Sequence, residues 1–286
     1  MFKHRKRKPK VLYGNYIYRL NKKDKDNIRT INLFYEDLFK YGNYILDNAF
    51  PGEVIKDYEL TIYSFLYKIM ELLDSMMVMS HQGLHNSSML VLRTLLESSA
   101  QLMCILHTDE HKREERAIVM QMLDIKHGCE NVEEFNKRME NHVLYKKFFY
   151  LIKDGEYDKW YCYCEGKKVT IRKLFENIGW LELYEKMYAA LCDDVHMSYH
   201  MEQNIYFYDS YTDKRFCFRP FRQFDSDKNN NIMLFLLQFV PLVYERFFTL
   251  YKIENRDWKL FKEKVEKELT SIYKIDVLIR NMMSCW

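Results

Sequence analysis

Apolar residues recur every three to four positions along most of the chain, which is the pattern of amphipathic helices. The first such stretch predicts a helix over about residues 25–47, which ends before Pro51. A second helix is expected over about 54–80, because helix-capping residue types cluster just beyond it. The apolar positions of the first helix are Ile28, Ile31, Phe34, Tyr35, Leu38, Tyr41, Tyr44 and Ile45.

The segment 86–107 differs from these two helices because it is apolar on almost every side. Such a helix is expected at the centre of a bundle, where other helices surround it. Residues 160–168 form an irregular stretch without a clear period. Further helices are predicted over about 110–127, 131–153, 170–178, 181–200, 229–253 and 257–281.

Residues 204–219 break the helical pattern. Two short aromatic runs, 206–208 and 216–218, flank a polar stretch there, which predicts a small β-hairpin. The chain holds only 4 Pro and 8 Gly, and so few helix breakers favour long helices over an all-β fold. The sequence therefore predicts an all-α multi-helix bundle with one small β-hairpin insertion, built as a single domain over 25–286.

Positive charge is concentrated at the start of the chain. The net charge is +3, but outside the first ten residues the chain has 38 basic and 41 acidic side chains, so its body is mildly acidic. A basic, flexible tail over 1–24 could bind RNA, DNA or an anionic surface, or could act only as a solubilising end. Its first basic residues are Lys3, Arg5, Lys6, Arg7, Lys8 and Lys10.

The sequence predicts a cytoplasmic protein. The basic start is followed by a short, interrupted apolar stretch over 11–18, so no signal peptide is expected. The longest apolar run, 232–244, is too short to span a bilayer. Seven cysteines without regular spacing fit a reducing compartment, and the close pair Cys162 and Cys164 lacks the spacing of a zinc site.

Arg93 and Glu97 are the only charged residues of the apolar helix over 86–107, and they lie one turn apart. Within a bundle both need partners, because removing one member of a buried pair typically costs ~3–5 kcal/mol. Arg before Glu is the weaker orientation for a bridge within one helix, so contacts to a neighbouring helix or a ligand are expected. An internal pair that fixes the helix register and a functional pocket both stay open.

A second polar group lies on the helix predicted over 181–200. Asp193, His196 and His200 share one face of a helical wheel there. Such a trio could hold a divalent metal or supply general acid and base groups, with Asp orienting a His that titrates near neutral pH. A solvated surface face would show the same pattern. The apolar stripe on the opposite side consists of Tyr184, Tyr188, Leu191 and Val195.

Several common catalytic motifs are absent from the sequence. The chain has no phosphate-binding loop, dinucleotide-binding glycine motif, nucleophile elbow or H-E-x-x-H helix, so we predict no cofactor. The catalytic candidates are therefore the two polar groups above, and the metal candidates are those of the second group alone. Together the catalytic candidates are Arg93, Glu97, Asp193, His196 and His200.

Three short motifs resemble a bacterial family known as domain of unknown function 5677. They are R-T-L-L-E from Arg93, the Trp160 region leading into I-R-K-L-F-E-N-I-G, and Y-x-x-L-x-x-x-V-H ending at His196. The likeness covers about residues 60–200 and implies a helical fold without a settled activity. A looser likeness is to HEPN helical bundles, many of which are ribonucleases of toxin and antiphage systems with Arg and His on one helix. The chain departs from that pattern, because the helix over 181–200 has no Arg before His196.

Two hypotheses are consistent with these residues. In the first, the protein is a nucleic-acid-directed, ribonuclease-like effector in which Arg93 stabilises phosphate charge and His196 acts as acid or base. Arg93 and His196 should then meet in one cleft, with the basic tail nearby. In the second, the protein is a non-catalytic helical interaction module that could form a homodimer, with Arg93 sealed inside and His196 on an exposed face.

Overall fold

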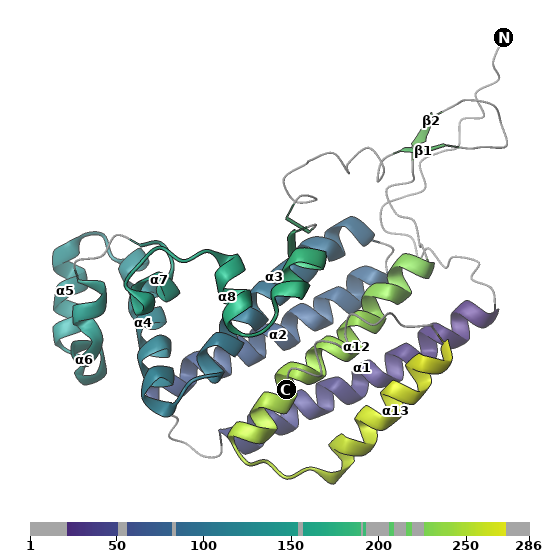
Figure 1. Ribbon diagram of the computed structural model, residues 1–286, viewed down its shortest axis with the longest axis horizontal. Helices are drawn as coiled ribbons and strands as arrows, with labels where there is room; N and C mark the ends of the chain where they lie inside the picture. The colour runs from purple at the N-terminus through teal and green to yellow at the C-terminus, as the bar shows by residue number, and fades with distance from the viewer. Residues whose placement is uncertain are drawn as a thin grey trace.

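The computed structural model describes residues 22–50, 56–81, 84–153, 157–189, 191–192, 206–208, 216–218 and 226–272 (Figure 1). Five long helices lie side by side in it. α2 packs along α3, α1 packs along α12, and α13 closes the row against α12 and α1. The five are α1 (Lys22–Ala49), α2 (Asp57–His81), α3 (His85–Leu106), α12 (Ser226–Leu250) and α13 (Arg256–Ile272).

Shorter helices gather at one end of this row (Figure 1). α4 joins them to the long helices, because it packs on α2 as well as on α6 and α7, while α8 packs on α3. This group consists of α4 (Glu110–Gly128), which at 19 residues is longer than α13 of the row, and of shorter helices. The shorter helices are α5 (Val132–Glu140), α6 (Val143–Ile152), α7 (Trp160–Glu165), α8 (Ile171–Asn177), α9 (Leu181–Leu183) and the π-helix η1 (Tyr184–Tyr188).

Two of the long apolar helices, α3 and α12, lie in the core. By length and composition alone, Ser87–Leu106 of α3 and Ile232–Leu250 of α12 could each cross a membrane. In the fold, 78% of the α12 segment and 56% of the α3 segment are buried inside the protein. The phenol of Tyr35 on α1 also donates to the backbone carbonyl of Met233 on α12 at 3.1 Å. Both helices therefore serve as core elements of this bundle.

Helix ends follow the signals in the sequence. Asp109 caps α4 by accepting a hydrogen bond from the backbone N–H of Lys112, and Asn131 caps α5 in the same way. Gly166 ends α7 with a φ of 62°, a left-handed conformation that glycine adopts without steric cost. The prediction of an all-α bundle is confirmed.

Two predictions of local structure were wrong. The helix expected over 131–153 is two helices, α5 and α6, because the chain turns at Asn141 and His142. The stretch 160–168, expected to be irregular, contains the six-residue helix α7, because Trp160 and its aromatic neighbours are buried there. The helix predicted over about 25–47 is α1, which begins at Lys22; residues 1–21 lie outside the described residues, so the flexible basic tail stays a prediction.

The aromatic runs of the predicted insertion pair as two short strands. Tyr206–Tyr208 (β1) and Phe216–Phe218 (β2) are antiparallel, with Phe207 opposite Cys217. The connecting residues 209–215 and both flanks lie outside the described residues. The hairpin insertion as a whole therefore stays a prediction.

Candidate functional site

α3 presents a polar stripe toward the shorter helices. Arg93, Glu97 and Gln101 follow one another at four-residue spacing, which places them on one face of the helix. Leu92 and Leu96, on other faces of α3, have no exposed surface. The stripe is therefore the side of this core helix that offers charged groups to a neighbour or a ligand.

Arg93, Glu97 and Tyr188 form one hydrogen-bonded group. Nη2 of Arg93 donates to the phenol oxygen of Tyr188 at 3.3 Å, and the Tyr188 hydroxyl donates to Oε2 of Glu97 at 2.9 Å. Arg93 and Glu97 also approach each other directly, with 3.8 Å between Nη2 and Oε2. The guanidinium carbon lies 5.5 Å from the centre of the Tyr188 ring, within the range of a cation–π contact. One phenol thus joins the two charges.

Cys192 is a further hydrogen-bond acceptor for Arg93. Nε of Arg93 donates to the Sγ atom of Cys192 at 3.2 Å. This hydrogen bond is the main reason that the pKa of Arg93 is raised, so the guanidinium stays charged. Parts of the chain that are far apart in the sequence therefore share one arginine: α3 carries it, and Tyr188 and Cys192 bind it.

Tyr188 is placed by the π-helix η1. The N–H of Ala189 bonds to the carbonyl of Tyr184, five residues earlier, which is the π-helical spacing. The Tyr188 ring is 2% exposed and lies between Tyr184, at 5.3 Å, and Phe175, at 5.2 Å. Burial, followed by the negative charge of Glu97, raises the pKa of Tyr188 far above its usual value. Its hydroxyl therefore keeps the proton that it donates to Glu97.

Part of the Arg93–Glu97 pair is still free to meet a ligand. The side chains are 29% and 26% exposed. Among the residues that the structure describes, Nη1 of Arg93 and Oε1 of Glu97 have no hydrogen-bond partner. A guanidinium held by Nε and Nη2 and open at Nη1 can donate to an anion, and phosphate oxygens are a preferred acceptor.

Polar contacts continue along α3 beyond Glu97. Gln101 accepts a hydrogen bond from the indole N–H of Trp160 at 2.8 Å. One turn further, Nη1 of Arg116 donates to the carbonyl of Cys104 at 2.6 Å, while Nη2 bonds to Glu165 at 3.2 Å. All these groups have partners, so this part of the stripe joins α3 to α4 and α7 and is architectural.

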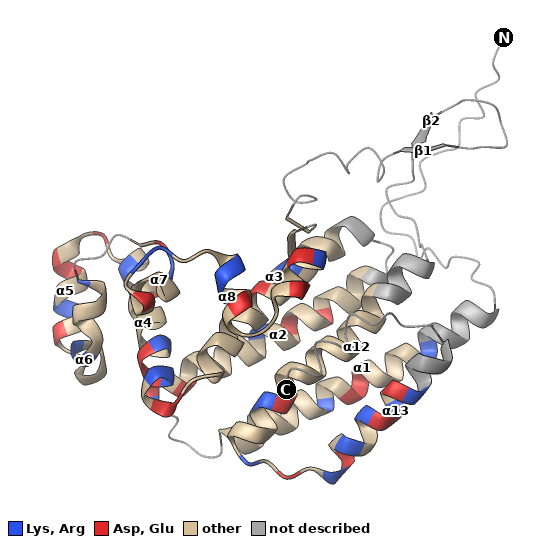
Figure 2. Ribbon diagram, in the orientation of Figure 1, with Lys and Arg blue, Asp and Glu red and all other residues tan. Residues whose placement is uncertain are grey.

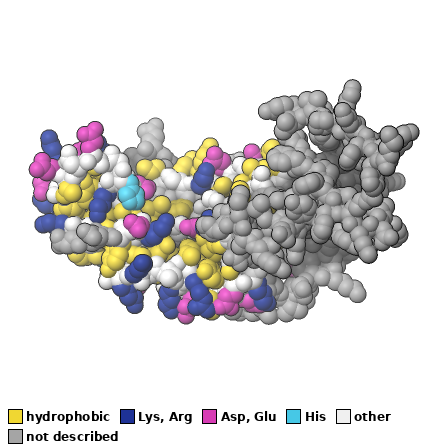
Figure 3. All heavy atoms as spheres, turned by 90° about the horizontal axis from the view of Figure 1, so that it is seen from above, with side chains coloured by type: hydrophobic (Ala, Val, Ile, Leu, Met, Phe, Trp, Pro, Cys, Tyr) yellow, Lys and Arg dark blue, Asp and Glu magenta, His cyan; other side chains and the backbone are white. Residues whose placement is uncertain are grey.

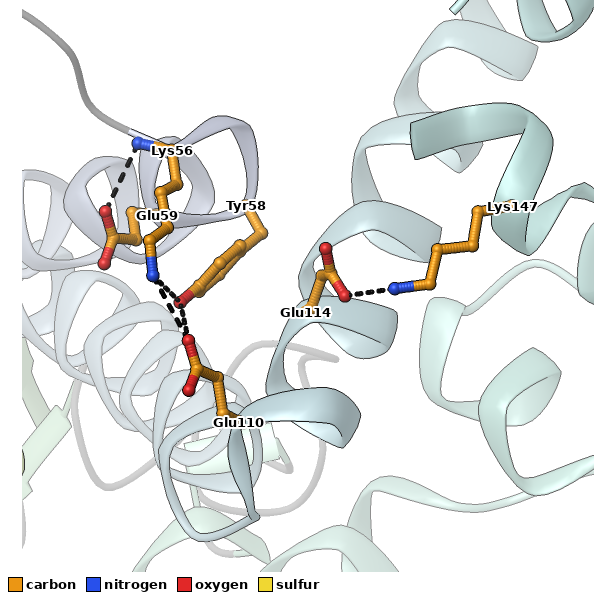
Figure 4. Close-up of polar contacts among 6 residues, drawn as sticks. All are labelled: Lys56, Tyr58, Glu59, Glu110, Glu114 and Lys147. Carbon is orange, nitrogen blue, oxygen red and sulfur yellow. Dashed lines mark hydrogen bonds and ion pairs between the residues drawn. The ribbon is translucent and has the colours of Figure 1, made fainter. Parts of the chain in front are cut away.

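A second polar region lies where α2, α4 and α6 meet (Figure 4). Glu110 accepts from Nζ of Lys56 at 3.2 Å and from the phenol of Tyr58 at 3.3 Å, and Glu114 accepts from Lys147 at 2.6 Å. Exposed ion pairs of this kind are each worth about 0–1 kcal/mol. These charges are all paired, so they tie the helices together and are weaker candidates for a site than Arg93.

Arg138 and His142, which lie four residues apart, do not form a joint site. Arg138 pairs with Glu134 at 2.7 Å, back along α5. His142 stacks on Tyr145 at 4.1 Å and faces Asp57 on α2, with 3.6 Å between Nε2 and Oδ2. The helix break between them turns their side chains toward different neighbours.

Of the candidate catalytic residues, the structure describes only Arg93 and Glu97. Arg93 and Glu97 do meet a neighbouring segment, as their weak orientation for a simple bridge predicted. Asp193, His196 and His200 lie outside the described residues, so their catalytic and metal roles stay predictions. Within the described ranges, no group of three His, Cys, Asp or Glu side chains could hold a metal.

Two residues of the group were missed in the sequence. Tyr188 was assigned to the apolar stripe, and Cys192 was given no role. The available signal was the position of Tyr188 at the start of the family-like Y-x-x-L-x-x-x-V-H motif, since a tyrosine combines an apolar ring with a polar tip.

Comparisons with known proteins identify a family but no activity. A family model described as "Family of unknown function (DUF5677)" matches residues 59–209. This range contains Arg93, Glu97, Tyr188 and Cys192 and agrees with the predicted likeness over about 60–200. No curated protein and no solved structure matches the chain.

Proposed function

The chain belongs to the DUF5677 family of unknown function, and from its site we propose that it binds the phosphodiester backbone of RNA and acts as a ribonuclease-like effector. Arg93 contacts phosphate in this proposal, and Glu97 with Tyr188 holds Arg93 in place. His196 acts as general acid or base, Asp193 orients it, and His200 is the second imidazole. By the looser HEPN likeness, the setting would be a bacterial toxin or antiphage system in the cytoplasm.

One observation carries the proposal: Arg93 is bonded to the segment that leads directly into the second polar group. Cys192, which accepts the Nε–H of Arg93, is directly followed by Asp193 and lies four residues before His196. Cleavage of a phosphodiester places growing negative charge on phosphate oxygens, and a fixed cation at that point lowers the barrier. The hydrogen bond to Cys192 fixes the Arg93 guanidinium in this way. Cys192 in turn directly precedes the candidate acid and base residues in the sequence.

The distribution of charge supports a local contact over a broad one. In Figure 2, Lys and Arg alternate with Asp and Glu along the described helices. Figure 3 shows the same mixture on the upper face, with apolar side chains between the charged ones. Nucleic-acid affinity would then come from the Arg93 site together with the basic tail, whose first ten residues carry six Lys and Arg side chains that would raise the local concentration of RNA.

The test uses the full chain with total RNA, in the presence and absence of EDTA. Wild type should cleave RNA, and Arg93→Ala and His196→Ala should lose cleavage while thermal melting shows that they fold. Arg172→Ala is the matched control, because Arg172 is an exposed arginine that pairs with Glu185 at 2.7 Å. A loss of cleavage on EDTA addition would indicate a divalent metal, with Asp193, His196 and His200 as its candidate ligands.

Intact RNA with the wild-type protein, or equal cleavage by Arg93→Ala, would refute this proposal. The alternative is then a non-catalytic helical interaction module, in which the Arg93 group fixes the register of α3 against the segment 184–192. A filter-binding assay with single-stranded RNA separates the two roles. Arg93→Ala should bind RNA more weakly than Arg172→Ala if Arg93 contacts phosphate, and equally well if the Arg93 group only fixes the helix register.

A further inference from the structure

The outer face of α2 carries a stripe of exposed apolar side chains. Leu60, Tyr67 and Val78 are 53%, 58% and 55% exposed. At 100° per residue, spacings of seven and eleven residues return almost to the same side of a helix, so the three lie on one line. At a rise of 1.5 Å per residue this line is about 27 Å long.

An apolar groove runs beside one half of this stripe. It has a volume of about 450 Å³ and lies between α2 and α4, and Tyr145 of α6 also lines it. Leu60, Ser64 and Lys68 are among the residues of α2 that line it, and Met120 lines it from α4. Leu60 belongs to both the stripe and the groove, so the two surfaces adjoin at that end of α2.

We propose that a second copy of the chain occupies these adjoining surfaces, with the two α2 helices antiparallel about a two-fold axis. The axis passes between Tyr67 and Glu71 on the outer face, at the height of the buried Ile69. The stripe is self-complementary under that operation. Leu60 and Val78 lie equally far before and after Ile69 in the sequence, so each meets the other on the second copy. The Val78 end of each helix then lies beside the apolar groove of the other copy.

The polar residues of the same face also match under this symmetry. Ser64 comes opposite Asp74 of the second copy, where its hydroxyl can donate to the carboxylate. Tyr67 comes opposite Glu71, which is paired with Lys68 within α2 at 2.7 Å. Lys68 lies next to the axis, so its ammonium group can reach the Glu71 carboxylate of either copy. No like charges are brought face to face along the stripe, which is what an isologous interface requires.

The proposal is independent of any action on RNA. It is tested on the full chain by sedimentation velocity over a range of concentrations. Wild type should sediment as a dimer, and Tyr67→Glu should raise the dissociation constant at least tenfold, because it places a carboxylate against Glu71 of the other copy twice per dimer. Tyr150→Glu is the matched control, since Tyr150 is a similarly exposed tyrosine on α6, at 68%.

A charge exchange tests the orientation of the helices. Lys68→Glu should weaken the dimer, and adding Glu71→Lys in the same chain should restore it, because the pair is then reversed on both copies. A wild-type chain that stays monomeric up to about 0.1 mM would overturn the proposal. So would a dimer that Tyr67→Glu and Lys68→Glu leave unchanged, while circular dichroism shows that both variants are folded.

Discussion

Replacing Tyr188 by Phe removes one oxygen atom from the centre of the Arg93 group. The variant keeps the ring, so the contacts with Tyr184 and Phe175 and the cation–π contact with Arg93 remain. The substitution removes the hydroxyl that accepts from Arg93 and donates to Glu97. It therefore measures the hydrogen bonds and leaves the packing in place.

The expected cost is set by these two contacts. A hydrogen bond to a charged group contributes about 1.5–3 kcal/mol, and the 2.9 Å bond to Glu97 is of this kind. Glu97 is 26% exposed, so water can replace part of the loss. The 3.8 Å contact between Arg93 and Glu97 remains, but a part-exposed pair adds less than about 1 kcal/mol. We expect Tyr188→Phe to lower the free energy of unfolding by about 1–2 kcal/mol.

Urea unfolding at pH 7, followed by circular dichroism, measures this change. Tyr184→Phe is the matched control, because the Tyr184 hydroxyl has no hydrogen-bond partner among the described residues. A double-mutant cycle with Glu97→Gln should give a coupling energy of about 1 kcal/mol, since the two residues share one bond. A Tyr188→Phe variant as stable as Tyr184→Phe, with no coupling to Glu97, would refute the account of Tyr188 as the link between the charges.

Three further substitutions test the packing of the bundle. Gly42→Ala should destabilise by about 1–3 kcal/mol in urea unfolding, because the added Cβ would lie 2.6 Å from the buried phenol oxygen of Tyr244; an equally stable variant would contradict this. Arg246→Met should cost about 1–3 kcal/mol in the same assay, because it removes both donors, at 3.2 and 2.8 Å, to the Leu106 carbonyl at the end of α3. Burial, then Arg246, lowers the pKa of His107 from 6.5 to about 4. The unfolded chain therefore gains this proton first as the pH falls from 6.5 to 4, so stability is lost over that window, and the melting temperature of His107→Gln should drop less between pH 7 and pH 5 than that of wild type.

The long helices could be predicted because their signals are local. The apolar period located α1 and α2, and Asp109 marks the start of α4. The break between α5 and α6 has no such signal, because the turn near Asn141 contains neither Pro nor Gly and the apolar period continues across it. The helix α7 is held by the burial of Trp160 against other helices, which no pattern within six residues could reveal.

The site could be predicted on α3 and not on the segment that faces it. Two charges on an apolar helix must find partners, so Arg93 and Glu97 differed from their surroundings in the sequence alone. The residues that bind Arg93 and Glu97 could not be identified in this way, because their placement depends on the helix type of residues 184–189. A wheel of 100° per residue groups Tyr184 with Tyr188 and Leu191, but a π-turn holds one residue more and rotates the residues after it. In the structure the Tyr188 and Tyr184 rings still stack on each other, and Tyr188 and Leu191 are buried as the wheel predicts. What the wheel could not give is that the Tyr188 hydroxyl, at the polar tip of a buried ring, reaches Arg93 and Glu97 on α3.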